Sequence, residues 1–197
     1  MQVSSGFRPR AACSRCLEPS IRSGVTPFRP LGGEYSVSGA PLLIKDVPRF
    51  SHRGLLIDSG RHFEPVKQIK ALIESMTYAK LNVLHWHLTD DESFPLASRV
   101  HPELPRLGAW DAQEQYTWRD LQDIVEYARL RGIRVVPEFD MPGHTSSWRK
   151  SHPELFALGC SGKERGAFDP AENRTFDFLE ASIFASLRPI SMLKRHP

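Results

Sequence analysis

Acidic, basic and histidine side chains recur at three places in the sequence, and each place directly follows a short apolar run. The three clusters are Asp58 with Arg61, then Asp90, Asp91 and Glu92, and then Glu138, Asp140 and His144. Carboxylates and the arginine guanidinium group hydrogen-bond well to neighbouring hydroxyls. These residue types therefore predict a polar, hydroxyl-rich ligand, provided that the fold brings the three clusters together.

The elements that would position these clusters alternate between strands and helices. Apolar, β-rich runs predict strands over 54–58, 83–88 and 133–139. Helical spacing of apolar residues predicts a helix from Pro65 through Tyr78 and another from an N-cap at Thr117 to Gly132 as the residue after its end. A last helix is expected from near Asn173 through Ile183.

This order of elements predicts an α/β fold built from βαβ units with a parallel sheet. In such sheets the ligand lies at the carboxyl ends of the strands, where all three polar clusters are expected. Strand-to-helix loops also carry polar residues that only cap or turn the chain, and Asp90 or Asp91 could serve in that way. Three consecutive polar loops on one edge favour a binding site.

Composition and charge restrict the possible classes of protein. The chain has 197 residues, 40% of them hydrophobic and 25% charged, which is ordinary for a globular protein. No apolar stretch approaches the roughly 20 residues needed to span a bilayer. The net charge of +3 arises at the two ends, since residues 1–33 hold five arginines and one acid, and residues 181–197 hold three basic residues and no acid. The middle is net acidic, which argues against a nucleic-acid partner.

The two ends differ in pattern from the middle. Residues 1–45 are expected to form a basic leader that is largely disordered, without the continuous apolar core of a secretory signal. An organelle-import sequence is an open alternative, because the leader is rich in Arg and Ser and poor in acids. Cys13 and Cys16 form a C-x-x-C, but with Cys160 as the third cysteine we expect incidental thiols. Residues 181–197 are expected to be a divergent tail.

Four blocks in the middle of the chain resemble the β-N-acetylhexosaminidases of glycoside hydrolase family 20. The blocks are residues 50–62, 82–91, 124–135 and 138–145, and they occur in the family's order. The block from Glu126 to His144 looks most like the lysosomal α/β subunit type. The resemblance covers residues 46–180.

This resemblance implies a (β/α)₈ barrel that binds a sugar at its carboxyl edge. Arg61 would hold the C3 and C4 hydroxyls of a terminal N-acetylhexosamine, and Asp90, Asp91, Asp140 and His144 would form the supporting polar network. Substrates would be glycans or glycolipids that end in N-acetylglucosamine or N-acetylgalactosamine, with no cofactor. The resemblance also implies a lysosomal or secreted location and possible dimerisation with a full-length subunit.

The family's catalytic residues are an adjacent Asp and Glu at the end of the fourth strand. The only Asp-Glu dipeptide in this chain is Asp91-Glu92, which aligns with the second-strand block. We therefore expect an incomplete barrel of three to four βα units in which no catalytic residue is present. Because general-acid catalysis is worth about 10²–10⁴-fold, we expect little turnover by this chain alone.

Two hypotheses of other kinds stay open. In one, the chain is a non-catalytic truncated form that binds sugar weakly or associates with a full-length subunit. In the other, it is an unrelated metal-binding α/β protein in which His85, His87 and His144 hold the ion. Histidines on a strand beside Trp86 are more often packed or hydrogen-bonded, and we expect no metal there.

Overall fold

The computed structural model describes residues 28–31, 34–37, 47–159 and 164–191. The predictions for Cys13, Cys16 and Cys160, and for most of the 1–45 leader, lie outside these residues. Across the described part of the chain, no helix is both long and apolar enough to cross a lipid bilayer.

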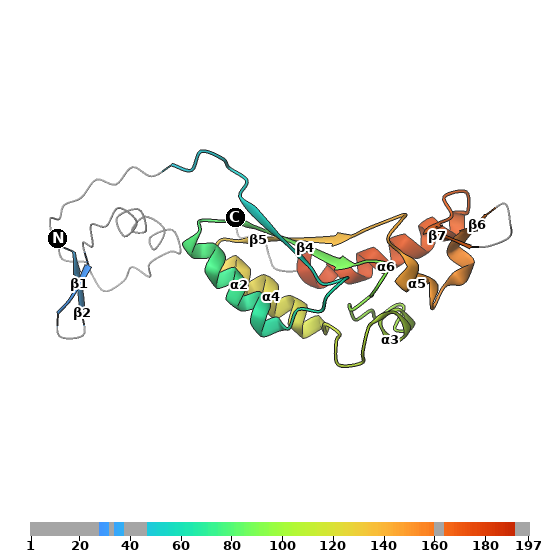
Figure 1. Ribbon diagram of the computed structural model, residues 1–197, viewed down its shortest axis with the longest axis horizontal. Helices are drawn as coiled ribbons and strands as arrows, with labels where there is room; N and C mark the ends of the chain where they lie inside the picture. Colours follow the sequence, from blue (N-terminus) through green and yellow to red (C-terminus); the bar gives the residue numbers. More distant parts are fainter. Residues whose placement is uncertain (1–27, 32–33, 38–46, 160–163, 192–197) are drawn as a thin grey trace.

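A three-stranded parallel sheet runs through the middle of the molecule (Figure 1). Its strands are β3 (Gly54–Asp58), β4 (Val83–Thr89) and β5 (Arg134–Phe139), in the spatial order β3-β4-β5. Each expected strand is confirmed to within one residue at either end. A helical connection follows each of β3 and β4 and returns the chain to the end of the sheet where the previous strand began. The next strand therefore runs in the same direction.

Two helices of 13 residues each, α2 (Val66–Tyr78) and α4 (Trp118–Leu130), lie side by side along the sheet. Thr117 caps α4 in a capping box with Asp120, which satisfies two backbone N–H groups at the helix start. Gly132 follows the end of α4 with a φ of 67°, a conformation that favours glycine. The sequence signals for both ends of α4 are thus confirmed.

The core lies between the sheet and these helices. Leu84, Trp86 and Leu88 point from alternate positions of β4 toward the helices and are fully buried. They contact the apolar faces of both helices, which contribute Ile69, Ile73, Met76, Leu121, Ile124 and Ala128. Helix α6 (Asn173–Ser191) begins at the expected residue, contacts α4, and adds Phe178 to the same core.

Several short elements occupy the connections for which the sequence predicted no structure. These are α3 (Glu103–Gly108), α5 (Ser146–Arg149), the 3₁₀ helix η1 (Pro153–Leu155), and the antiparallel pair β6 (Phe156–Leu158) and β7 (Glu164–Phe168). Trp148 of α5 explains their placement, since it is fully buried and its ring stacks edge-on against Phe94 and Phe168. These contacts join residues far apart in sequence, so no local sequence pattern predicts them.

A small hairpin was also not expected in the leader. Strands β1 (Phe28–Leu31) and β2 (Glu34–Val37) pair in antiparallel fashion, with Leu31 opposite Glu34. Two glycines separate the strands in the sequence, and Gly-Gly is a strong local signal for a tight hairpin. The sequence analysis did not predict this eight-residue hairpin within the leader.

Candidate functional site

The carboxyl ends of the three strands place one polar residue from each strand in a single row. Asp58 of β3 is in register with His87 of β4, which is in register with Glu138 of β5. Neighbours in register on parallel strands point to the same face, and here that face is the one opposite the buried Leu84 and Trp86. The loops that leave these strand ends carry Arg61, Asp90 and His144, so the fold gathers all three predicted clusters at one edge.

Arg61 lies at the centre of the site. Its Nη1 is 2.6 Å from Asp58 Oδ2 and its Nη2 is 2.8 Å from Asp90 Oδ2. Glu92 lies 3.8 Å from Nε. The Arg61 side chain is 47% exposed, so the guanidinium is held by carboxylates on one side and remains open to solvent on the other. Such an arrangement can offer N–H donors to a ligand hydroxyl.

Asp90 is almost completely buried, with 1% of its side chain exposed. Its Oδ1 accepts from the backbone N–H of Asp91 at 2.7 Å and lies 3.0 Å from His144 Nδ1, while Oδ2 lies 2.8 Å from His87 Nε2. Burial by itself raises the pKa of Asp90, but these hydrogen bonds and the charge of Arg61 outweigh it, so the pKa is lowered. Asp90 is therefore a carboxylate that fixes the groups around it.

His144 reaches the site from the loop after β5 with a φ of 57°. This left-handed backbone conformation is uncommon for residues other than glycine, and it is often found in functional loops. The hydrogen bond to Asp90 raises the pKa of His144. His144 Nδ1 also lies 3.3 Å from Arg61 Nη2, and an Nδ1 that donates to Asp90 cannot accept from Arg61 at the same time. Asp90 thus contacts both the Arg61 guanidinium and the His144 imidazole.

The remaining two predicted site residues lie at the periphery of this group. Asp91 is exposed, and its Oδ1 accepts from the backbone N–H of Ser146 at the start of α5. Asp140 follows β5, half-buried, and its negative charge contributes to the raised pKa of His144. All five predicted residues therefore lie at the carboxyl ends of the strands, with Arg61, Asp90 and His144 in direct contact.

Sequence reasoning missed a second hydrogen-bonded group on the same face. Glu138 Oε2 lies 2.5 Å from His85 Nε2 and 2.9 Å from His87 Nδ1, so one carboxylate joins two histidines of β4. Burial lowers the pKa of His87, but its hydrogen bonds to Glu138 and Asp90 outweigh burial and raise it. His85 and His87 lie two residues apart on β4, but their common partner Glu138 lies about 50 residues further along the chain, so no local pattern predicts the contact.

This pairing also bears on the metal hypothesis. His85 and His87 both contact Glu138, which is the packed and hydrogen-bonded alternative of the sequence analysis. Among the described residues, His144 belongs to a different group of close potential ligands, with Asp90 and Asp91. The three histidines of that hypothesis therefore do not form one site.

A buried layer under the Arg61 loop holds it against the sheet. Ser59 Oγ accepts from Trp86 Nε1 at 2.8 Å and lies 3.0 Å from the Tyr116 hydroxyl, which also donates to the carbonyl of Glu64 at 2.6 Å. Gly60 allows the close approach, since a Cβ there would lie 2.7 Å from the backbone nitrogen of Asp90. The backbones of the Arg61 loop and the Asp90 loop are thus in close contact.

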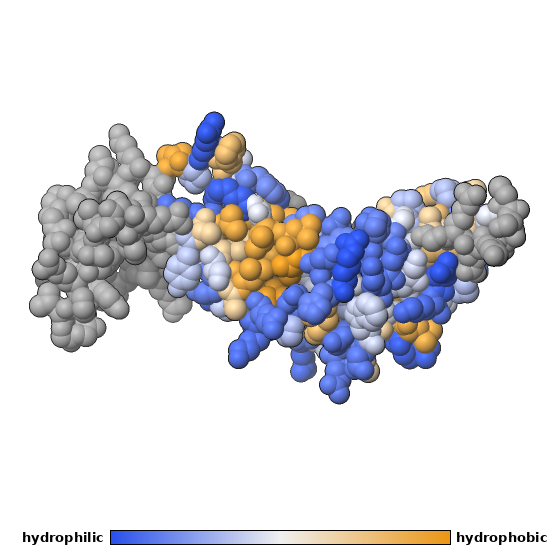
Figure 2. All heavy atoms as spheres, in the orientation of Figure 1, coloured by the Kyte–Doolittle hydropathy of each residue, from blue (hydrophilic) through white to orange (hydrophobic). Residues whose placement is uncertain are grey.

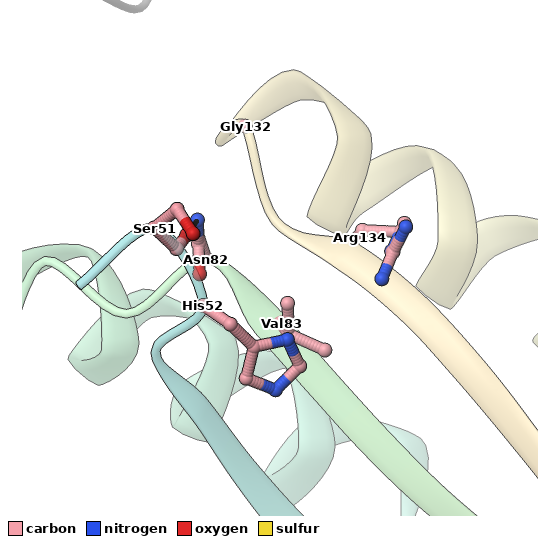
Figure 3. A pocket seen from close by; sticks show the side chains of 6 residues that line it. All are labelled: Ser51, His52, Asn82, Val83, Gly132 and Arg134. Carbon is pink, nitrogen blue, oxygen red and sulfur yellow. Dashed lines mark hydrogen bonds between the residues drawn. The ribbon is translucent and has the colours of Figure 1, made fainter.

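A separate pocket lies at the opposite, amino-terminal ends of the strands. It is lined by Ser51, His52, Asn82, Val83, Gly132 and Arg134, and Figure 3 shows these side chains around the start of β4 and β5. The side-chain amide of Asn82 holds the segment before β3 by two hydrogen bonds. Its Oδ1 accepts from the backbone N–H of Arg53, and its Nδ2 donates to the carbonyl of Ser51. Residues at this end of a parallel sheet commonly support stability, and the pocket holds none of the site residues.

A parallel sheet covered by helices, with a polar cluster at the carboxyl ends of its strands, is typical of part of an α/β barrel. The family model "Glycosyl hydrolase family 20, catalytic domain" matches residues 50–191. The chain belongs to glycosyl hydrolase family 20.

Curated relatives agree with this assignment. Beta-hexosaminidase subunit beta of Felis catus is 47% identical over 151 residues, which are 75% of this chain and 28% of the relative. Beta-hexosaminidase 1 of Arabidopsis thaliana is 47% identical over 152 residues, 77% of this chain and 27% of the relative. The chain thus spans less than a third of the length of these relatives.

Solved structures show the same fold. The chitobiase of Flavobacterium johnsoniae superposes with a TM-score of 0.72 at 30% identity, over 91% of this chain and 27% of that one. An exo β-N-acetylglucosaminidase of Vibrio harveyi, solved in complex with N-acetylglucosamine, gives a TM-score of 0.61 at 31% identity over 70% of this chain and 25% of that one. The expected fold, an incomplete (β/α)₈ barrel, is confirmed.

Proposed function

We propose that this chain carries the part of a β-N-acetylhexosaminidase site that holds the terminal N-acetylhexosamine. The observation that carries the proposal is the contact of Arg61, Asp90 and His144 at the carboxyl edge of the sheet. Arg61 donates to the C3 and C4 hydroxyls from its solvent-exposed side. Asp90 holds Arg61 and His144 in place, and Asp91 and Asp140 complete the polar network around the sugar.

In a complete enzyme of the family, the proposed reaction is substrate-assisted and retains the configuration at the anomeric carbon. The acetamide oxygen of the sugar attacks the anomeric carbon, a Glu protonates the leaving oxygen, and an adjacent Asp orients the acetamide. Asp91-Glu92 is the only Asp-Glu dipeptide of the chain, and both members have other contacts, Asp91 with the N–H of Ser146 and Glu92 with Arg61. We therefore propose that these 197 residues alone bind the sugar without hydrolysing it.

Substrate class and location follow the same resemblance. The ligands are glycans or glycolipids that end in N-acetylglucosamine or N-acetylgalactosamine, and the compartment is the lysosome or the cell exterior. Association with a full-length family subunit is part of the proposal, and its place is the side of β3 that pairs with no other strand of the described residues.

Sugar binding is tested with the 197-residue chain, N-acetylglucosamine and ligand-observed NMR. We expect weak binding that Arg61→Ala abolishes. Arg129→Ala is a matched control, because Arg129 is 49% exposed and also forms an ion pair with a neighbouring acid, yet lies on α4. Equal binding by wild type and Arg61→Ala, or no binding by wild type, would refute the proposed site.

Hydrolysis is tested on the same protein with a chromogenic N-acetylglucosaminide. We expect a rate equal to that of buffer, because the general acid and the acetamide-orienting Asp each contribute directly to the chemical step. Turnover above buffer that disappears in Arg61→Ala would contradict the proposed lack of catalysis. It would still agree with the proposed sugar site.

A further inference from the structure

A second cluster of ionisable side chains lies outside the proposed sugar site, between α3 and the turn from α5 to η1. It consists of His101, Glu103 and His152, whose potential ligand atoms all lie within 4.8 Å of one another. Glu103 Oε1 is 3.1 Å from His101 Nδ1 and 2.9 Å from His152 Nε2. The cluster shares no residue with the group around Arg61.

The two distances from Glu103 to the histidine nitrogens are close to those between ligand atoms of a zinc site. Zinc binds imidazole nitrogen and carboxylate oxygen at about 2.0–2.2 Å, so two ligand atoms of a tetrahedral site lie roughly 3.3 Å apart. The two measured separations are within a few tenths of an ångström of this value. Two imidazoles with one carboxylate favour zinc over magnesium or calcium, which prefer oxygen ligands.

The surroundings of His152 are those of a metal-bound histidine. Its second ring nitrogen, Nδ1, lies 3.1 Å from Glu154 Oε1. Metal-binding histidines usually donate their other N–H to a carboxylate, which fixes the tautomer and leaves the first nitrogen free to bind. Carboxylate oxygens therefore lie at both ring nitrogens of His152, Glu154 at Nδ1 and Glu103 at Nε2.

Packing holds the two imidazoles in place. Both rings lie against Phe178 of α6, with centroid distances of 4.4 Å for His101 and 4.5 Å for His152. Ser98 Oγ accepts from the backbone N–H of His101 at 3.0 Å and so fixes the turn that carries it. The His101 and His152 side chains are 20% and 17% exposed, which leaves a path for an ion from solvent.

We propose that His101, Glu103 and His152 form a zinc site, with Glu154 as the carboxylate that orients His152. Such an ion would join two segments about 50 residues apart in sequence, the start of α3 and the turn before η1. The site leaves a coordination position for water or for the second oxygen of Glu103. It is a structural metal site that links these two segments and lies apart from the sugar-binding residues.

The test is titration of the full chain with Zn²⁺ by calorimetry and with Co²⁺ by visible absorption. The protein used carries the substitutions Cys13→Ser, Cys16→Ser and Cys160→Ser, so that thiols do not contribute to metal binding. We expect one tight site with the intense absorption of tetrahedral cobalt. His101→Gln, Glu103→Gln and His152→Gln should each abolish it, and Glu154→Gln should weaken it about tenfold or more.

His62→Gln is the matched control, since His62 is an exposed histidine outside the cluster and its loss should leave the titration unchanged. Far-UV circular dichroism shows which variants fold, and Glu103→Gln and Glu154→Gln keep the shape and one acceptor oxygen of the original side chains. Absence of zinc binding by the thiol-free chain, or equal binding by the folded ligand variants, would overturn the proposal and identify the cluster as a hydrogen-bonded one only.

Discussion

Asp90 connects Arg61, His87 and His144 across three segments of the chain. Its two oxygens contact groups from the loop after β3, from β4 itself and from the loop after β5. Because the side chain is buried, each contact is poorly replaced by water. Loss of the charge at this one residue should therefore disturb the whole group, whereas loss of an outer residue such as Asp91 should not.

Asp90→Asn is expected to lower the free energy of unfolding by about 1.5–3 kcal/mol, the usual value for hydrogen bonds to a charged group. Urea denaturation at pH 6 measures the change. Asp123→Asn is the control, since Asp123 is 56% exposed and pairs with Lys70 at the surface, and surface pairs are worth little. Equal effects of the two substitutions would contradict the role given to Asp90.

The same group should make stability depend on pH. The pKa of Asp90 is below its ordinary value of 3.8, so its contribution is present above about pH 3.8 and is lost as pH falls through the folded-state pKa. The pKa of His87 is above its ordinary value of 6.5, so its contribution is present below about pH 6.5 and is lost as pH rises through the folded-state pKa. The group should stabilise the fold most between these values, and Asp90→Asn should flatten the profile of urea midpoints against pH.

At the scale of elements, the sequence predicted what local chemistry determines. The β3, β4 and β5 runs and helices α2 and α4 follow from apolar periodicity and end signals such as Thr117 and Gly132. The site residues that sit directly after strands were found for the same reason. Short elements such as α5 depend on packing of Trp148 against distant rings, and the zinc-type cluster depends on His101 meeting His152, so neither has a local signature.

Gly132 offers a test of how strictly a helix end is determined. Gly132→Ala is expected to lower the free energy of unfolding by about 1–2 kcal/mol, because an alanine at a φ of 67° crowds its Cβ against the backbone. Gly143→Ala is the comparison, since a Cβ there would meet no atom within 4 Å and its φ is not positive. A change for Gly132→Ala no larger than that for Gly143→Ala would show that the conformation costs nothing.

At the scale of the whole molecule, helices α2 and α4 cover one face of the sheet. In the described residues β3 pairs with β4 alone and β5 pairs with β4 alone, so each has an unpaired edge. The barrel of the family closes such edges by continuing around. Figure 2 shows hydrophobic residues gathered over the region of β3, where Leu55 and Leu56 are 37% and 50% exposed. An exposed apolar edge of this kind favours pairing with another chain.

We therefore expect the 197-residue chain to self-associate in solution through β3. Leu56→Lys should weaken association about tenfold or more, because burial of one leucine is worth about 1.5–3 kcal/mol and a lysine at an edge opposes strand pairing. Leu130→Lys is the control, since Leu130 is 57% exposed at the end of α4, away from the sheet edge. Sedimentation velocity over a range of concentrations measures both. A monomeric wild type, or equal association by the two variants, would show that the edge of β3 is protected in another way.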